Sequence, residues 1–507
     1  MQSTALPIRT HRNFADGETF QDLLAERLRQ SPWMLLSGAV HVALLLMVWA
    51  MFPPDRPEPA KVRVALALPD LQDVIKPPPP PPPEIQPEVV EDDPVVVDEA
   101  FEPSDEDAND NSDVDATSST ESSFEFTGDN TAVGLSGNAG GPYGQRGTRG
   151  GGKRGGRSSA ASVARGLQWL AAHQDQDGRW DVDGFAKHDD PAFSLCSGPG
   201  NQVHDVGVTG LALLAFLGDN NTMRSGIYRD VVRKGVRWLK SVQQPNGLFG
   251  DAAAHDFVYD HAIAAYAMCE AYGLSQYKLL RRSAQQGLNY LESHRNSYGA
   301  WRYQPQDQDN DISVTGWCIM AYEAGKFFGL QVNEQALQNA EVFLDKISDE
   351  SGLHGYRRAG ERSGRRDYGG HATRFPAHKT HALTAVGLFS RFFLGQDPSE
   401  HGIMNASAKL LAEIPPKWDE ADGSIDHYYW YYATYALFQY GGKPWMQWQK
   451  ALERAVIPNQ HQAASQPNLL GSWDPIGAWG EDGGRVYTTA ILTLTLQANY
   501  RYSRLIR

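Results

Sequence analysis

Two kinds of helical segment alternate along the chain after residue 158. One kind carries the apolar stripe of an amphipathic helix, and the other consists almost entirely of small and apolar residues. The amphipathic segments span 163–173, 228–243, 279–293, 334–347, 403–414 and 445–456. The apolar segments span 205–217, 260–272, 311–328, 380–394, 426–439 and 487–500. The pattern therefore predicts an all-α domain of six helical hairpins.

This alternation matches a two-layer ring of hairpins. Inner helices would touch neighbours on both flanks and a central cavity, whereas outer helices would show one face to water. An open solenoid of hairpins meets the same pattern without closing. A closed ring would bring the N-termini of all inner helices, with their partial positive charge, to one mouth.

The loops after the outer segments share a glycine followed by an aromatic residue. The glycine allows a left-handed exit from the helix, and the aromatic ring fills the gap between hairpins. The three clear cases are Gly178 with Trp180, Gly247 with Phe249 and Gly299 with Trp301; weaker ones are Gly355 with Tyr356 and Gly471 with Trp473.

This Gln-x-x-x-Gly-x-Trp-like punctuation resembles the repeats of squalene and oxidosqualene cyclases and of protein prenyltransferase β-subunits. The resemblance covers about residues 158–507 and is greatest to membrane-anchored bacterial prenyltransferase/squalene-oxidase-repeat proteins. It implies an (α/α)6 toroid that binds an apolar or isoprenoid-like ligand in a central cavity. A fold by itself assigns no reaction.

Residues 33–52 form an uncharged segment of twenty residues between Pro32 and Pro53. This length predicts one transmembrane helix, with residues 1–32 as a cytoplasmic leader and the toroid in the periplasm, anchored to a bacterial inner membrane. A cleaved signal peptide is the alternative. Ser37 and His41 share one face of the segment. Their spacing resembles TonB-type anchors, which implies ExbB/ExbD-type motor proteins as partners; a generic helix partner would explain them equally.

Residues 53–157 predict a disordered linker. Seven consecutive prolines, 77–83, favour an extended spacer, and a Gly/Arg-rich stretch precedes the toroid. Residues 81–130 contain seventeen Asp or Glu and no Lys or Arg, so they account for more than the net charge of −15. The rest of the chain is nearly neutral. No nucleic-acid partner is therefore expected.

Acidic residues begin four of the apolar segments: Asp205, Asp260, Asp311 and Asp426. Each is either a helix N-cap or a ligand-binding group at the shared mouth. Histidines accompany them, and we name His261 and His381 as candidates for proton transfer and His427 as a ligand-binding residue. Neither a fixed spacing nor a cysteine partner supports a ligand set at these positions, so no metal and no cofactor is expected.

Residues 307–311 resemble the D-x-D-D run with which class II triterpene cyclases protonate an alkene. The resemblance makes Asp309 the acid, flanked by Asp307, with Asp311 as a third candidate; the alternative is a polar loop closed by an Asp311 cap. Prenyltransferases hold zinc with an Asp and a Cys two residues apart. Here Cys318 follows Asp311 by seven residues, which puts prenyltransferase activity in doubt.

Aromatic residues crowd the fifth and third apolar segments: Tyr428, Trp430 and Tyr431, with Trp317. Inward-facing rings would steady a carbocation, stack on a sugar or hold an isoprenoid chain. The main hypothesis is a membrane-anchored toroid that binds an apolar or isoprenoid-like ligand. One alternative is a terpene-cyclase-like or glycan-active enzyme using Asp and His at the mouth, and another is a motor-coupled module that binds proteins.

Overall fold

The computed structural model describes residues 157–362 and 370–505, which lie within one compact unit, Ala108–Arg507. The predicted anchor with Ser37 and His41, and the predicted linker, lie outside the described residues. Among the described helices, none has both the length and the apolar character needed to cross a bilayer.

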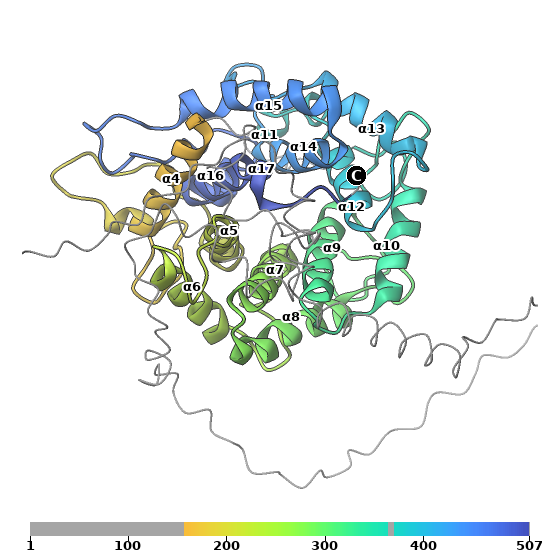
Figure 1. Cartoon of the computed structure of the whole chain (residues 1–507), viewed down its shortest axis with the longest axis horizontal. Coiled ribbons are helices and arrows are strands. Elements are labelled where there is room, and N and C mark those ends of the chain that lie inside the picture. The colour runs from red at the N-terminus through yellow and green to blue at the C-terminus, as the bar shows by residue number, and fades with distance from the viewer. Residues whose placement is uncertain (1–156, 363–369, 506–507) are drawn as a thin grey trace, which may run out of the picture. The chain divides into compact units, whose positions relative to one another are not determined.

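Six helices form the inner layer of the described region (Figure 1). Small and apolar residues on all sides of these helices let them pack closely against two inner neighbours and an outer helix, and nearly all of their residues are buried. They are α5 (Asp205–Gly218), α7 (Phe257–Ser275), α9 (Ile312–Phe327), α12 (Ala382–Phe393), α14 (His427–Tyr440) and α16 (Gly480–Leu496). Each contacts the next in this order, and α16 contacts α5. The ring is therefore closed, as predicted.

Six amphipathic helices surround the inner layer in the described region. They are α4 (Arg157–Ala172), α6 (Arg229–Ser241), α8 (Arg281–His294), α10 (Glu334–Lys346), α13 (Gly402–Glu413) and α15 (Gly442–Val456). The predicted all-α toroid is confirmed, and the only strand-like pairings among the described residues are two isolated bridges.

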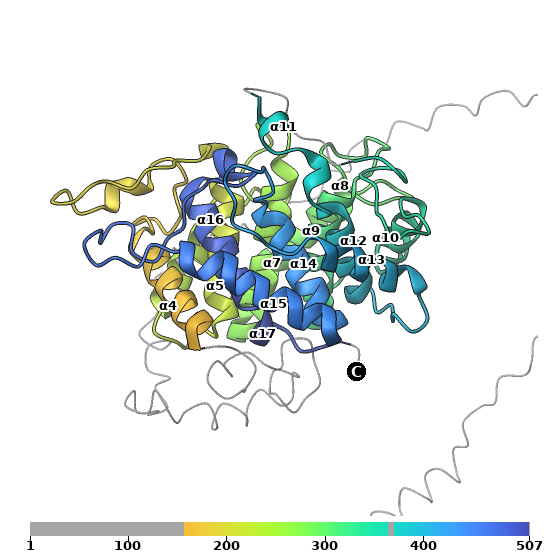
Figure 2. The same cartoon turned by 90° about the horizontal axis from the view of Figure 1, so that it is seen from above.

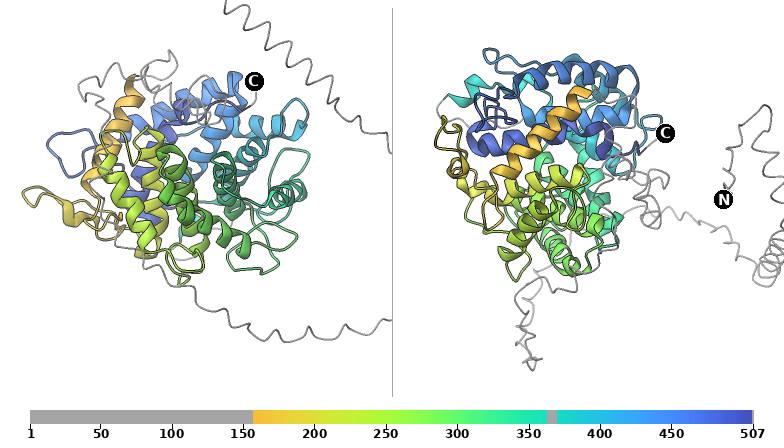
Figure 3. Two further views of the ribbon diagram at one scale, coloured as in Figure 1. Left: turned by 60° about the horizontal axis from the view of Figure 1, so that its bottom comes forward. Right: turned by 60° about the vertical axis from the view of Figure 1, so that its left-hand side comes forward.

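The alternation along the chain begins with an outer helix, but the packed pairs do not consist of an outer helix and the inner helix after it. Each outer helix packs mainly against the inner helix that precedes it, so α6 covers α5 and α8 covers α7. The first outer helix, α4, has no preceding inner helix and packs against α16, at the other end of the domain (Figure 3). The two ends of the domain thus form one hairpin together, and this contact closes the ring.

Repeated loop contacts hold neighbouring hairpins together. Gln243 donates to the carbonyl of Gly247 in its own loop (3.1 Å) and to Ser283 of the next outer helix (3.0 Å). Gln460 repeats this arrangement across the closure, with bonds to Gly471 (2.8 Å) and to Ser162 of α4 (2.9 Å). The same kind of contact therefore joins adjacent repeats and closes the ring.

The glycines of these loops are required by the approach of the next outer helix. Gly471 has φ +99°, and a Cβ there would lie 2.3 Å from the carbonyl oxygen of Arg165 in α4. Two residues later, the buried Trp473 donates from Nε1 to the carbonyl of Val456, at the end of α15 (2.8 Å). The glycine thus admits the neighbouring helix and the tryptophan ties the loop to its own helix.

The two ends of the ring differ. Figure 2 shows α11 (His371–Arg374) at one end and α17 (Ala498–Arg501) with the C-terminal segment at the other. Arg501 donates to the carbonyl of Leu214 in α5, and Tyr502 packs against Phe393 of α12 and Tyr435 of α14. The C-terminal segment therefore crosses the end of the ring at which the inner helices finish. The bore is closed there and remains hollow near the N-terminal ends of the inner helices.

Candidate functional site

A cavity of about 210 Å³ lies among the N-terminal halves of all six inner helices. Its polar residues are His204, Asp256, Asp260, Ser313 and Asp482, and its aromatic residues are Tyr259, Tyr303, Trp317, Tyr356, Tyr428, Trp479 and Tyr487. Apolar residues lie further along the helices, among them Leu211 and Ile263. The cavity thus lies at the mouth of the ring where the sequence pattern predicts that the N-termini of the inner helices meet.

An Asp–His pair forms part of the cavity wall. His204, just before α5, approaches the Asp260 carboxylate through Nδ1 at 3.1 and 3.3 Å. Burial disfavours the charged imidazole, but the bond to Asp260 outweighs it and raises the pKa of His204. Burial likewise raises the pKa of Asp260 despite its histidine partner. Both shifts favour the protonated forms, so the pair binds protons more tightly than the two isolated side chains would.

The backbone of α5 makes room for this pair. A Cβ on Gly207 would lie 2.3 Å from Oδ1 of Asp260. Glycine is thus the residue that lets the carboxylate approach α5 and meet His204. Asp260 was expected to begin its helix, but α7 begins a turn earlier at Phe257, and the side chain is directed to a neighbouring helix instead of capping its own.

Two further carboxylates lie on the cavity wall close to the pair. Asp256 precedes α7, and Asp482 belongs to the first turns of α16. Their negative charges both contribute to the raised pKa of His204. Asp482 on α16 and Asp260 on α7 belong to the two inner helices that contact α5, the helix that His204 precedes. The mouth therefore combines an imidazole, several carboxylates and aromatic rings.

Asp311 lies in the wall behind this cavity and is fully buried. One carboxylate oxygen caps α9 by accepting from the Val314 amide (2.8 Å), which confirms the cap. The other, Oδ2, makes no hydrogen bond of ordinary geometry with the described residues. Burial raises the pKa of Asp311 to about 7, and burial, followed by the charge of Asp311, raises the pKa of the cavity residue Tyr356. Asp311 thus has the environment of a carboxylic acid kept protonated.

The other two members of the acidic run lie outside the cavity. The Asp309 carboxylate pairs with Arg302 and with Arg357 (3.2 Å) and is 45% exposed. Asp307 is exposed and accepts from the Asp309 amide (3.1 Å). Neither side chain lines the cavity, and the Asp309 carboxylate is paired with two arginines instead. The resemblance therefore names as the acid a residue that lies outside the cavity.

The predicted histidines also lie away from the cavity. His261 is fully buried, accepts from the Phe249 amide at Nδ1 (3.0 Å) and donates from Nε2 to Gly287 (3.1 Å). Burial lowers its pKa to about 3, so it remains neutral. Burial also lowers the pKa of His381, which is half-buried and does not line the cavity, although the next residue, Ala382, does.

Asp205 and Asp426 make structural hydrogen bonds, and His427 packs against the rings of Trp418 and Trp430. Asp205 accepts from the Val182 amide (3.0 Å) and pairs with Arg179, and burial raises its pKa to about 6. Asp426 caps α14 through the Tyr429 amide (3.0 Å), as predicted for a cap. His427 is buried, and burial lowers its pKa to about 4.

Of the four predicted aromatic residues, Trp317 and Tyr428 line the cavity. Tyr431 stacks beneath Trp317, with ring centroids 5.8 Å apart, and belongs to the packed part of the bore. Trp430 faces the outer layer, where it contacts Trp418. Trp430 and Tyr431 lie outside the cavity because consecutive residues on α14 point in different directions, so they cannot share the cavity-facing side with Tyr428.

Several cavity residues had no signal in the sequence. Tyr303, Tyr356 and Trp479 come from loops, Asp256 directly precedes α7, and Asp482 and Tyr487 belong to α16 on the two sides of its kink at Gly484. His204 directly precedes Asp205 in the sequence and lies outside the apolar segment that begins there. The available signal was the pair of polar residues immediately before α5 and α7, since these positions face the mouth in a ring of parallel inner helices.

Comparison with known proteins gives similarity of arrangement only. No protein-family profile and no curated protein matches the chain. Among solved structures, an α-amylase from Clostridium perfringens matches with TM-score 0.44 and 11% identity, over 67% of this chain and 98% of that one. An inactive α-1,6-mannanase variant from Salegentibacter sp., in complex with α-1,6-mannotriose, matches with TM-score 0.45 and 11% identity over the same shares. A type II terpene cyclase from Scytonema matches with TM-score 0.42 and 13% identity, over 68% and 97%. These values assign neither a family nor a reaction.

Proposed function

We propose that this protein is a glycan-active enzyme that uses acid–base chemistry and holds a sugar residue in the cavity at the N-terminal mouth of the toroid. The observation that carries the proposal is the His204–Asp260 pair in the wall of an aromatic cavity, with Asp482 also on that wall. Enzymes that cleave glycosidic bonds commonly place two carboxylic groups about the scissile bond, one protonated and one ionised. Asp260, whose pKa burial raises, suits the acid, and Asp482 is the second carboxylic group that the cavity wall offers.

The size and the walls of the cavity support a sugar residue. Drug-sized ligands occupy pockets of about 300–1,000 Å³. A cavity of about 210 Å³ therefore holds a smaller group or one end of a longer chain. Tyrosine and tryptophan rings offer apolar faces for stacking and polar edges for hydroxyl groups. Tyr428 presents a buried hydroxyl that makes no hydrogen bond of ordinary geometry with the described residues.

The test is a screen of the full chain against an array of α- and β-linked oligosaccharides, with products identified by mass spectrometry. Asp260→Asn and Asp482→Asn should each lower turnover by at least about 100-fold, the usual contribution of a general acid or base. Asp309→Asn, outside the cavity, is the matched control and should retain activity. Unchanged turnover in both cavity variants would remove the proposal.

A second candidate is the binding of an isoprenoid-like amphiphile. It is favoured by the apolar end of the cavity, where Leu211, Ile263 and Trp317 lie deeper than the polar groups of the mouth. An apolar chain would enter this end and leave a polar head near His204. Mass spectrometry of the purified full chain after incubation with a lipid extract tests it, and repeated absence of a bound isoprenoid would argue against it.

We also propose that residues 33–52 anchor the chain in a bacterial inner membrane with the toroid in the periplasm. The uncharged length of the segment supports this, and Ser37 and His41 on one face supply a contact for an ExbB/ExbD-type motor. Photo-crosslinking from position 41 should capture a multi-spanning partner. Crosslinks to lipid alone would remove the motor from the proposal.

A further inference from the structure

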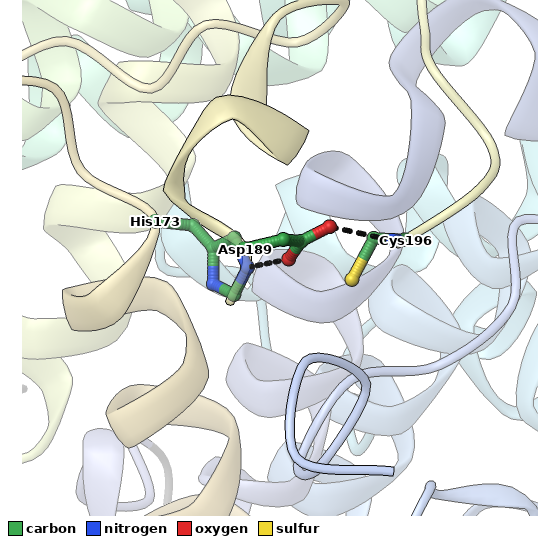
Figure 4. A group of neighbouring side chains, drawn as sticks. All are labelled: His173, Asp189 and Cys196. Carbon is green, nitrogen blue, oxygen red and sulfur yellow. Dashed lines mark hydrogen bonds and ion pairs between the residues drawn. The ribbon is translucent and has the colours of Figure 1, made fainter. Parts of the chain in front are cut away.

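A cluster of potential metal ligands lies outside the cavity, beside the long loop between α4 and α5. Figure 4 shows His173, which follows α4, with Asp189 between it and Cys196. One ligating atom of each residue lies within 4.8 Å of the others. The Asp189 side chain is fully buried, and His173 and Cys196 are 4% and 8% exposed. None of the three lines the cavity described above.

The orientation of His173 suits a metal ligand. Its Nδ1 lies 2.8 Å from the carbonyl oxygen of Trp169, which only accepts, so Nδ1 is the donor. The other nitrogen, Nε2, points to Oδ1 of Asp189 at 3.0 Å. Histidines that bind metals typically donate one N–H to a carbonyl or carboxylate and bind the metal through the other nitrogen.

Asp189 and Cys196 are also held with one atom available. Oδ2 of Asp189 accepts from the Cys196 amide (2.5 Å), which leaves Oδ1 facing His173. The Cys196 thiol donates to the Asn468 carbonyl (3.0 Å). That carbonyl also accepts from Nε1 of Trp169 (2.7 Å). It therefore keeps a donor when the thiol loses its proton.

We propose that His173, Asp189 and Cys196 bind one zinc ion through Nε2, Oδ1 and Sγ, with water as the fourth ligand. Tetrahedral zinc with bonds of about 2.0–2.3 Å sets its ligand atoms roughly 3.3–3.8 Å apart, so small side-chain movements accommodate the ion. A thiolate, an imidazole and a carboxylate favour zinc over magnesium or calcium, which prefer oxygen ligands.

The charges of the three side chains suit a buried zinc ion. As the Zn–S bond forms, the thiol proton leaves to solvent, and Cys196 becomes a thiolate. One thiolate and one carboxylate then neutralise the two positive charges of zinc, and His173 stays neutral. The buried group as a whole carries no net charge, which avoids the cost of an uncompensated ion in the interior.

The zinc would fasten a segment that has little regular structure. Residues 189–201 contain no helix, and Phe193 and Leu195 are exposed. Long irregular segments of this kind need specific contacts to hold one conformation. The ion would join both ends of the segment's core, Asp189 and Cys196, to the end of α4. Asn468, which bonds Asp190 and Ser194, already ties the same segment to the loop before α16.

The experiment uses the full chain, purified in detergent, stripped with a chelator and titrated with ZnCl₂ or CoCl₂. Native mass spectrometry should show one zinc ion per chain. The cobalt form should show a near-ultraviolet thiolate-to-metal charge-transfer band. In Cys196→Ser the band should vanish, and in Asp189→Asn zinc should bind at least about tenfold more weakly.

Cys269→Ser is the matched control, because Cys269 is also buried but lies outside the cluster. It should keep both the zinc ion and the cobalt band. Circular dichroism verifies that each variant is folded; should Cys196→Ser fail to fold, the cobalt band of the unmodified chain decides. Absence of that band, or its loss in Cys269→Ser and retention in Cys196→Ser, would overturn the proposal.

Discussion

The two ends of the ring are built from the same six inner helices but satisfy their polar groups differently. At the closed end, Arg501 pairs with Glu270 at 2.9 and 3.1 Å, and both side chains are fully buried. At the mouth, Oδ2 of Asp311 and the hydroxyl of Tyr428 are buried and make no hydrogen bond of ordinary geometry with the described residues. Buried groups of this kind lower stability unless a ligand or a proton satisfies them.

The difference indicates that the same helical repeat stabilises the ring at one end and leaves room for a ligand at the other. The C-terminal segment fills the closed end with a charged pair and aromatic rings, which fixes the ring. The mouth receives only loops and helix starts, so space and unsatisfied groups remain there. Stability is thus expected to depend mainly on the closed end, and ligand binding on the mouth.

The largest effect is expected from breaking the buried ion pair. Glu270→Gln leaves Arg501 charged and without its counterion in a place from which it cannot reach water. This should lower the free energy of unfolding by about 3–5 kcal/mol, measured by urea denaturation. Glu334→Gln, in an exposed pair with Lys326, is the control and should change it by less than about 1 kcal/mol. Equal effects would mean that the closed end does not hold the ring.

A smaller effect, dependent on pH, is expected from Asp311→Asn. Burial raises the pKa of Asp311 from 3.8 to about 7, so between these values the folded chain binds more protons than the unfolded chain. Its contribution to stability is complete below pH 3.8 and is lost as the pH rises to 7. The asparagine variant retains the cap, and it should gain at most about 4 kcal/mol relative to the unmodified chain between pH 4 and pH 8, at about 1.4 kcal/mol for each pKa unit. Parallel stability curves would contradict the assignment.

The His204–Asp260 pair predicts a shift of titration rather than a large change of stability. His204 should titrate above 6.5, and in Asp260→Asn its pKa should fall, because burial then acts without the carboxylate. The stabilisation from the pair is present below 6.5 and is lost as the pH rises through the folded-state pKa of His204. NMR titration of the imidazole measures both values, with the buried His261 as a signal that does not titrate above pH 5. An unchanged pKa of His204 in Asp260→Asn would show that the two residues do not interact, contrary to this prediction.

The smallest effect is expected from Asp309→Asn. This carboxylate is 45% exposed, and its pairs with Arg302 and Arg357 are partly screened by water. The loss of stability should stay below about 1 kcal/mol in urea denaturation. Glycan binding measured in parallel should be unchanged, because the side chain lies outside the cavity. A loss of binding comparable to that of Asp260→Asn would return Asp309 to the site.

Much of the fold was predictable because it depends on local pattern. Apolar surface on all sides places a helix in the inner layer, and a single stripe places it in the outer layer. The N-cap roles of Asp311 and Asp426 were among the predicted alternatives for the same reason. A carboxylate at the start of a helix accepts hydrogen bonds from the first backbone amides of that helix. The site was less predictable. Asp260 and His261 are neighbours in the chain, yet one faces the cavity and the other is used inside the packing.

The sequence by itself determined the helices, their two kinds and the glycine–aromatic loops, because each rests on interactions within a few residues. Only the tertiary structure decided that α4 completes the hairpin of α16, where Gln460 bonds Ser162 across 298 residues of chain. It also decided that Arg501 and Tyr502 close one end and that His204 meets Asp260 at the other. These contacts depend on the closure of the ring, which brings together side chains whose directions no local pattern specifies.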